Sequence, residues 1–417
     1  MHTVTSRSVR FACAMLLAAL AGSAIAGPIT PPAGPVTSTM KTMTEVEPRI
    51  AINSVNTPGD ATTMFVISQP GSYYLTSDIT TTGNKVGIRI LASDVTVDLN
   101  GMTVRRGAGA TSSSAIRDDI DTENAEQTIT IRNGTIRGFA TAGNYGIYSA
   151  GNTKLVARDL FLLNCAFGIT VENGPLDASG ITATGTSTTA GYGLSGTSGT
   201  IIAASSVSNF GTGYYVNEGL LADSVATGCG MGANVTRARV ENFAASTTLS
   251  GAVGMEASAY STVSDSLFTT MTTGIKVLGV GVLIDNCTFN SGNTGVQLWS
   301  SDAVVRNNVF KDMTTIGSNG VCIKAEAGAT RNVIENNQGS NFNFGISIAA
   351  AGNTVIGNKF GNPLSSGLAI YSFPIGTRHG AIVKVNNSTS GVIVGSSTPG
   401  VIPSTLGTTE PTANLYW

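Results

Sequence analysis

The stretches TGIKVLGVGVLIDNCTFN at residues 273–290 and TGVQLWSSDAVVRNNVFK at residues 294–311 are two copies of one pattern, 21 residues apart. Each copy has a glycine followed by an apolar residue directly after its first threonine, and each ends with a second run that carries Asn and Phe. Alternation of apolar and polar residues is typical of strands. Because one such unit cannot bury its apolar side alone, the repeat predicts a solenoid of stacked coils.

The same glycine–apolar pair recurs on both sides of these copies, at intervals of 19 to 25 residues. The pairs are Gly146-Ile147, Gly168-Ile169, Gly193-Leu194, Gly213-Tyr214, Gly232-Ala233, Gly254-Met255, Gly274-Ile275, Gly295-Val296, Gly320-Val321, Gly345-Ile346 and Gly367-Leu368. The chain has 51 glycines and few helix signals, which favours many short strands joined by tight turns. We expect each anchor glycine to begin a strand.

The start of the chain is typical of a Sec-type signal peptide. Arg7 and Arg10 precede a short apolar run, and Ala24-Ile25-Ala26 is a small-residue cleavage site, with cleavage expected after Ala26. The chain is therefore expected to be secreted, periplasmic or on the cell surface. The predicted organisation is a signal peptide (1–26), a flexible leader (27–49), an N-terminal cap (50–86), a β-helix (87–373) and a C-terminal tail or cap (374–417).

Composition argues against two classes of partner. Charged residues make up 12 % of the chain, about half of the ~25 % usual in soluble domains. There is no basic stripe, so nucleic acid is not an expected partner. No segment after the signal peptide has 18 uninterrupted apolar residues, so we expect no membrane span. Cys165, Cys229, Cys287 and Cys322 fall at coil positions unsuited to pairing, so we expect buried free thiols.

Asn and Phe form rows in the second run of each coil. Asn286 and Asn307 are predicted to hold left-handed corners and to form a hydrogen-bonded ladder, because Asn tolerates that conformation. Phe289 and Phe310 are predicted to stack inside the solenoid.

The residue two after each anchor glycine is expected to face outward, because the residue one after it faces the core. This row reads Tyr148, Thr170, Ser195, Tyr215, Asn234, Glu256, Lys276, Gln297, Cys322 and Ser347. The plus-four row adds Glu172, Asn217, Trp299 and Lys324. Such a face suits an extended sugar chain, because aromatic rings stack on sugars and polar groups bind hydroxyls and carboxylates.

The candidate substrate-binding residues in these rows are Tyr215, Asn234, Gln297 and Trp299. A β-elimination lyase needs a base and a group that neutralises the substrate carboxylate. Glu256, Lys276 and Lys324 are the candidate catalytic residues. The alternative is that Glu256 and Lys276 form a cross-strand ion pair on a solvated face.

Residues 107–127 interrupt the rhythm and are expected to project as a loop. The candidate metal ligands in this insertion are Asp118, Asp119, Asp121 and Glu123, whose spacing resembles a calcium loop. A solvated acidic loop is the alternative, and the sequence leaves both open.

The stretches PGSYYLTSDI (70–79) and DVTVDLNGMTV (94–104) resemble the entry coils of secreted bacterial right-handed parallel β-helix repeat proteins of the pectate-lyase-like superfamily. The resemblance covers roughly residues 60–375. It implies an all-β, single-stranded, right-handed parallel β-helix, which we expect to have about eleven or twelve coils and an N-terminal cap. The superfamily includes lyases, hydrolases, esterases, epimerases and adhesins.

The polygalacturonase-like hydrolase motif needs a histidine on a coil, and His379 is the only histidine beyond the signal peptide. A lyase is therefore favoured over a glycoside hydrolase if the chain is an enzyme. We expect an exported protein that binds, and in one alternative cleaves, a polysaccharide along one face. The other alternative is a non-catalytic adhesion or structural solenoid.

Overall fold

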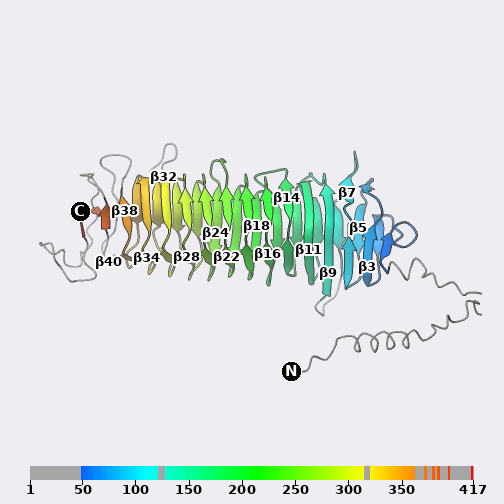
Figure 1. The fold of residues 1–417 in the computed structure, drawn as a ribbon, viewed down its shortest axis with the longest axis horizontal. Helices are drawn as coiled ribbons and strands as arrows, with labels where there is room; N and C mark the ends of the chain where they lie inside the picture. The colour runs from blue at the N-terminus through cyan, green and yellow to red at the C-terminus, as the bar shows by residue number, and fades with distance from the viewer. Residues whose placement is uncertain are drawn as a thin grey trace, which may run out of the picture. The chain divides into compact units, whose positions relative to one another are not determined.

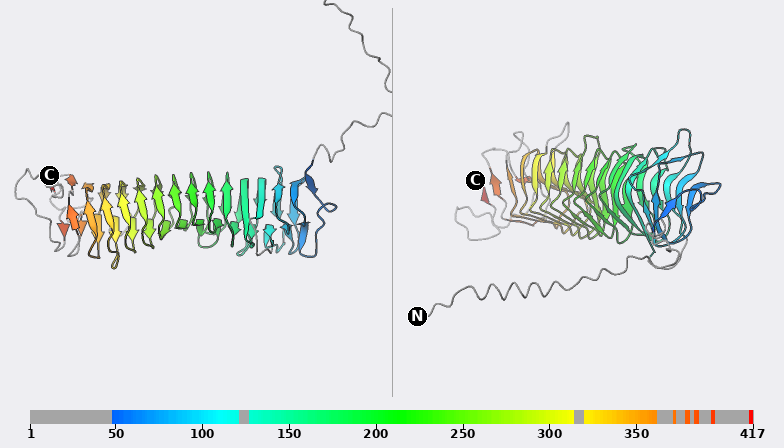
Figure 2. Two further views of the ribbon diagram at one scale, coloured as in Figure 1. Left: turned by 90° about the horizontal axis from the view of Figure 1, so that it is seen from below. Right: turned by 45° about the vertical axis from the view of Figure 1, so that its right-hand side comes forward.

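The computed structural model describes residues 48–120, 127–313 and 320–361, with five further short strands between 371 and 416. Residues 49–417 form one compact unit. Its described elements are all strands, paired in parallel with those of the preceding and following coils (Figures 1 and 2). No helix in this part of the chain is long and apolar enough to cross a membrane. The expected all-β parallel β-helix is confirmed.

Among the described residues, sheet B contains fifteen strands stacked one per coil, so the solenoid has more than the eleven or twelve coils expected. In stacking order they are β2 (Thr63–Ile67), β5 (Val86–Ile90), β8 (Ser114–Asp118), β10 (Tyr145–Ser149), β12 (Phe167–Val171), β15 (Tyr192–Gly196), β18 (Thr212–Asn217), β21 (Met231–Thr236), β24 (Val253–Ser258), β27 (Thr273–Val277), β30 (Thr294–Leu298), β33 (Val321–Ala325), β36 (Phe344–Ile348), β39 (Tyr371–Ser372) and β42 (Ile393–Val394).

Sheet A supplies two further strands to most coils, in two parallel ladders joined by a bend. The first ladder contains β1 (Ile50–Ile52), β3 (Gly71–Leu75), β6 (Val95–Asp98), β13 (Leu176–Ser179), β16 (Ile201–Ala203), β19 (Leu220–Ala222), β22 (Arg239–Glu241), β25 (Thr262–Ser264), β28 (Leu283–Asp285), β31 (Val304–Arg306), β34 (Val333–Glu335), β37 (Thr354–Ile356) and β40 (Arg378–Gly380). The second contains β4 (Ile79–Thr81), β7 (Thr103–Arg106), β14 (Thr182–Gly185), β17 (Ser206–Ser208), β20 (Val225–Thr227), β23 (Ala244–Ser246), β26 (Leu267–Thr269), β29 (Thr288–Asn290), β32 (Val309–Met313), β35 (Gln338–Phe342), β38 (Lys359–Gly361), β41 (Val383–Val385) and β43 (Leu415–Tyr416). The long strands β9 (Gln127–Arg137) and β11 (Thr153–Cys165) take part in both.

The anchor glycines lie where the core leaves no room for a side chain. A Cβ on Gly274 would lie 2.5 Å from the Phe289 ring and 2.6 Å from the backbone oxygen of Gly295. A Cβ on Gly295 would meet the Phe310 ring at 2.4 Å. Neither glycine has a positive φ. The repeat therefore uses glycine here for space, not for its conformational freedom.

The core row of sheet A contains the expected phenylalanine stack. Phe268 and Phe289 lie with ring centroids 5.2 Å apart, and Phe289 and Phe310 with centroids 4.8 Å apart. All three rings are buried. Parallel rings at this spacing repeat the strand spacing of the sheet, so each coil adds one ring to a continuous apolar column.

Two adjacent rows of residues form the corner between the two ladders: one row makes the bend, and the next row makes the hydrogen bonds. Asn286 and Asn307 have φ values of 53° and 56° and make the left-handed bend. The buried hydrogen-bond ladder is formed by the next residues: Asn308 Nδ2 donates to Asn337 Oδ1, and Asn337 Nδ2 donates to Asn358 Oδ1, each at 2.9 Å. The single Asn row expected from the sequence is thus two rows.

The prediction that residues 107–127 project as a loop is wrong for its central part. Residues 114–118 form β8, which pairs with β5 and β10 in sheet B. Ala115-Ile116 occupies the place of a glycine–apolar pair, because Ile116 pairs with Ile88 and Ile147. Alanine is small enough for that position, so a search for glycine alone missed this coil.

The assignment of Cys322 to the outward row is also wrong. Ile323 pairs with Val296, so Cys322 takes the anchor position and is fully buried. Lys324 then pairs with Gln297 in the outward plus-two row, not the plus-four row. The pair Gly320-Val321 precedes the true anchor by two residues. Gly367-Leu368 lies outside the described residues.

The four cysteines from Cys165 to Cys322 are free and buried, as expected. Burial raises the pKa of the Cys165 and Cys287 thiols to about 12, so both are neutral apolar groups. The segment predicted as a cap contributes β1 to β4, which pair in parallel with the following coils. In the predicted tail, β40 and β41 continue the two ladders of sheet A.

Candidate functional site

The outer face of sheet B carries two rows of side chains that run along the stack, and each coil contributes one residue to each row. The anchor glycine and the residue after it both face the core, so strict alternation is interrupted there. As a result, the residue before the glycine faces outward, as does the residue two after it. The pairing register gives the plus-two row as Val66, Arg89, Arg117, Tyr148, Thr170, Ser195, Tyr215, Asn234, Glu256, Lys276, Gln297, Lys324 and Ser347.

Five aromatic rings form a continuous group on this face, over β10 to β18. We call Tyr145, Tyr148, Phe167, Tyr192 and Tyr215 the aromatic run. Successive centroid distances are 4.6 Å for Tyr148 to Tyr145, 4.8 Å for Tyr145 to Phe167, 6.1 Å for Phe167 to Tyr192 and 5.7 Å for Tyr192 to Tyr215. All five side chains are partly exposed. Three of them, Tyr145, Phe167 and Tyr192, lie in the row before the glycine, which the sequence analysis did not consider.

Polar groups flank the aromatic run. The Arg117 guanidinium lies over the Tyr148 ring, 5.2 Å from its centroid. Burial, with a hydrogen bond to Glu172, raises the pKa of Tyr148 to about 12, and burial also raises the pKa of Tyr145. Both hydroxyls therefore stay protonated and can act as hydrogen-bond donors in any physiological medium.

The candidates predicted in the middle of the stack do lie together. Lys276 Nζ is 3.1 Å from Glu256 Oε1, and Asn234 Nδ2 donates to Glu256 Oε2 at 3.4 Å. These residues occupy consecutive coils, β21, β24 and β27. The cross-strand ion pair considered as the alternative is therefore present.

A second ion pair follows in the next coils. Lys324 Nζ lies 2.6 Å from Glu326 Oε1, and Gln297 Nε2 donates to the same oxygen at 2.6 Å. Trp299 is 51 % exposed beside this group. Glu326 was not predicted; it can be found only once Cys322 is placed at the anchor position, since that register puts Lys324 in the outward row. We call Asn234, Glu256, Lys276, Gln297, Lys324 and Glu326 the polar row.

The described acidic candidates do not share one site. Asp118 faces the core, where it accepts hydrogen bonds from Ser149 Oγ at 2.7 Å and the Ile120 N–H at 2.9 Å. Asp119 faces outward and pairs with Arg89 and Arg117. Asp121 and Glu123 lie outside the described residues. No group of three or more His, Cys, Asp or Glu suited to a metal ion occurs in the described ranges.

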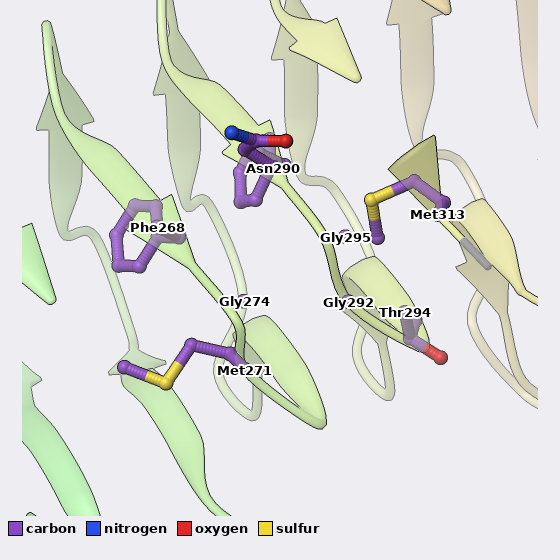
Figure 3. A pocket seen from close by; sticks show the side chains of 9 residues that line it. Phe268, Met271, Gly274, Asn290, Gly292, Thr294, Gly295 and Met313 are labelled. Atoms are coloured by element: carbon purple, nitrogen blue, oxygen red, sulfur yellow. The ribbon is translucent and has the colours of Figure 1, made fainter. Parts of the chain in front are cut away.

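A narrow crevice lies at the corner near Met271 and Met313 (Figure 3). Phe268 and Phe289 form part of its wall. Its volume of about 10 Å³ is close to that of one water-sized sphere. The lining includes no charged side chain, so the crevice is a packing defect and not a polysaccharide site.

Comparison with known proteins agrees with this architecture. The profile of the family described as right handed beta helix region matches residues 250–406. No curated protein sequence matches the chain.

Three solved structures illustrate the likeness. An alginate lyase from Paenibacillus sp. str. FPU-7 has a TM-score of 0.35 and 15 % identity, over 68 % of this chain and 98 % of the lyase. The A-module of a mannuronan C-5 epimerase from Azotobacter vinelandii has a TM-score of 0.39 and 13 % identity, over 84 % and 91 %. A tailspike mutant of E. coli bacteriophage HK620, in complex with a hexasaccharide, has a TM-score of 0.38 and 11 % identity, over 81 % and 66 %.

Likeness at these identities concerns the fold and not the activity. The matched profile, the parallel pairing and the stacked register all describe the same architecture. The chain is a parallel β-helix protein, and its residues 250–406 match the right handed beta helix region family.

Proposed function

We propose that this chain is an exported protein that binds a polysaccharide along the outer face of sheet B. The observation that carries the proposal is the aromatic run, five partly exposed rings in contact over consecutive coils. Exposed aromatic rings offer flat apolar faces with polar edges, which match the alternating apolar and hydroxylated surfaces of sugars. Their spacing follows the strand spacing, so the run suits an extended ligand that crosses several strands.

Binding is better supported than a lyase reaction that uses the predicted lysines. A lysine that acts as a β-elimination base must be uncharged, whereas Lys276 and Lys324 each lie in an ion pair with a carboxylate. An amine that is paired with a carboxylate in this way suits contact with polar groups of a ligand better than it suits proton abstraction. We therefore assign Lys276 and Lys324 to a secondary contact region and not to catalysis.

The test is affinity electrophoresis of the purified protein in gels that contain alginate, polygalacturonate, dextran or xylan. A double variant, Tyr192→Ala with Tyr215→Ala, should bind the retarding polysaccharide about tenfold more weakly or worse, because each ring removed deletes a stacking contact. Phe161→Ala is the matched control, since Phe161 is 53 % exposed on sheet A. Equal retardation of the wild type and the double variant would refute the role of the aromatic run.

A further inference from the structure

A pocket lies beside the aromatic run, at its N-terminal end. It is built from residues at β2, β5 and β8, and has a volume of about 280 Å³. Arg89 and Arg117 line it, together with Asp119, Thr63, Asn84 and Ser113. Arg117 pairs in register with Tyr148, so the pocket and the run occupy neighbouring coils of the same face.

The Asp119 carboxylate binds both arginines, and each arginine contacts it through its Nε. Arg89 Nε donates to Asp119 Oδ2 at 2.7 Å, and Arg117 Nε donates to Asp119 Oδ1 at 2.5 Å. Among the described residues, neither guanidinium makes another hydrogen bond. Because a guanidinium has five N–H donors, the Nη groups of both arginines remain available. Two cations and one carboxylate leave this group with a net charge of +1.

The pocket also contains an unused polar atom. Thr63 is 1 % exposed, and its Oγ1 has no hydrogen-bond partner in the described part of the chain. This hydroxyl is enclosed by the protein, so the contacts that the pocket offers to a ligand are the guanidinium groups. Orienting two guanidinium forks with a shared carboxylate prepares them for a planar or tetrahedral anion.

We infer that this pocket is a subsite for a singly charged anionic substituent, a carboxylate or a sulfate ester, on the sugar chain that the aromatic run binds. The inference rests on the proposed function. It adds a selectivity for anionic ligands and an orientation of the bound sugar chain along sheet B. The acidic unit lies over β5 and β8, and the rest of the chain extends toward β18.

The experiment uses isothermal titration with three probes of equal length: a galacturonate tetramer, its methyl ester and a monosulfated neutral tetramer. The wild type should bind an anionic probe about tenfold more tightly than the ester, since charge-assisted hydrogen bonds are the stronger kind. The better of the two anionic probes identifies the substituent. The preference should vanish near 1 M salt, where the Debye length is about 3 Å.

Arg89→Gln should abolish the preference, by lowering the affinity for the anionic probe to that for the ester. Arg105→Gln, which removes an exposed cation from β7 of sheet A, is the matched control and should keep the preference. If the wild type binds acid, sulfate and ester equally, or if Arg89→Gln keeps the preference, the subsite is refuted while the aromatic run stands. If the wild type binds none of the probes and no polysaccharide, both proposals are refuted.

Discussion

Two groups of coils each carry a row of neighbouring aromatic rings, and the two rows lie on opposite sides of the coil wall. Over β10 to β18 the rings face outward and form the aromatic run. Over β24 to β33 the outer face of sheet B holds the ion pairs of the polar row, and in the same coils sheet A carries the buried column of Phe268, Phe289 and Phe310. The difference teaches that an aromatic residue in a β-helix indicates a sugar site only when its position in the coil faces outward.

The inner column should dominate stability. Phe289→Ala removes a fully enclosed ring between two others, so we expect unfolding to be easier by about 3–5 kcal/mol. Chemical denaturation, followed by circular dichroism, measures the change. Phe161→Ala, on the exposed side of sheet A, should change stability little. A similar loss of unfolding free energy in both variants would contradict the expected difference between the buried and the exposed rings of sheet A.

The glycine and the ring that it faces should act as one unit. Gly274→Ala places a Cβ 2.5 Å from the Phe289 ring, and we expect a loss of about 1–3 kcal/mol. In a Phe289→Leu background the same substitution should cost less, because the obstructing ring is gone. A double-mutant cycle measures this coupling. Purely additive losses would mean that the neighbouring backbone, and not the ring, excludes the side chain.

The N-terminal half contains a buried carboxyl group, that of Asp118, which should make the unfolding free energy depend on pH. Burial raises the pKa of Asp118 above 3.8, so the folded state binds this proton more tightly than the unfolded chain. Its contribution is therefore fully present below pH 3.8 and is lost as pH rises through the folded pKa. The difference in unfolding free energy between the wild type and Asp118→Asn should fall across that interval. A flat difference would contradict the assignment.

The smallest effect is expected from the outer face of the C-terminal half. Lys276→Ala combined with Trp299→Ala should weaken polysaccharide binding by a few-fold at most, because exposed ion pairs contribute about 1 kcal/mol or less. The Tyr192→Ala and Tyr215→Ala variant should lose far more in the same gel assay. If the order is reversed, the binding face lies over the polar row and the comparison of the two halves must be redrawn.

The fold could be predicted because its signal is periodic. The pairs at Gly274 and Gly295 each mark a strand whose glycine faces a phenylalanine ring in the core. The spacing of such pairs was therefore enough to predict the solenoid. The predicted register was wrong in the coils where another small residue takes the place of the anchor glycine. Ala115 and Cys322 fill anchor positions as glycine does, and only the pairing of Ile116 and Ile323 with their neighbours reveals them.

The candidate site was predicted less well, for a reason of geometry. Strict alternation from the anchor would place the preceding residue inside, so the outward rows predicted from the sequence did not include Tyr145, Phe167 and Tyr192. The irregular step at the glycine turns them outward instead. Asp119 shows the same limit: its arginine partners lie 30 residues and two residues away, and only the β5–β8 pairing brings Arg89 beside it.

Each strand of the ladders pairs only with the strand before it and the strand after it. Energetically the molecule is then a one-dimensional array of coupled units, in which a disturbance weakens with the number of coils it must cross. The aromatic run ends at β18, and inside the solenoid the phenylalanine column continues to the same strand, with centroids 6.1 Å apart for Phe268 and Phe243 and 5.9 Å apart for Phe243 and Tyr214. The coil of β18 therefore couples the aromatic run to the inner packing, and the coils nearer β8 are progressively more independent of that packing.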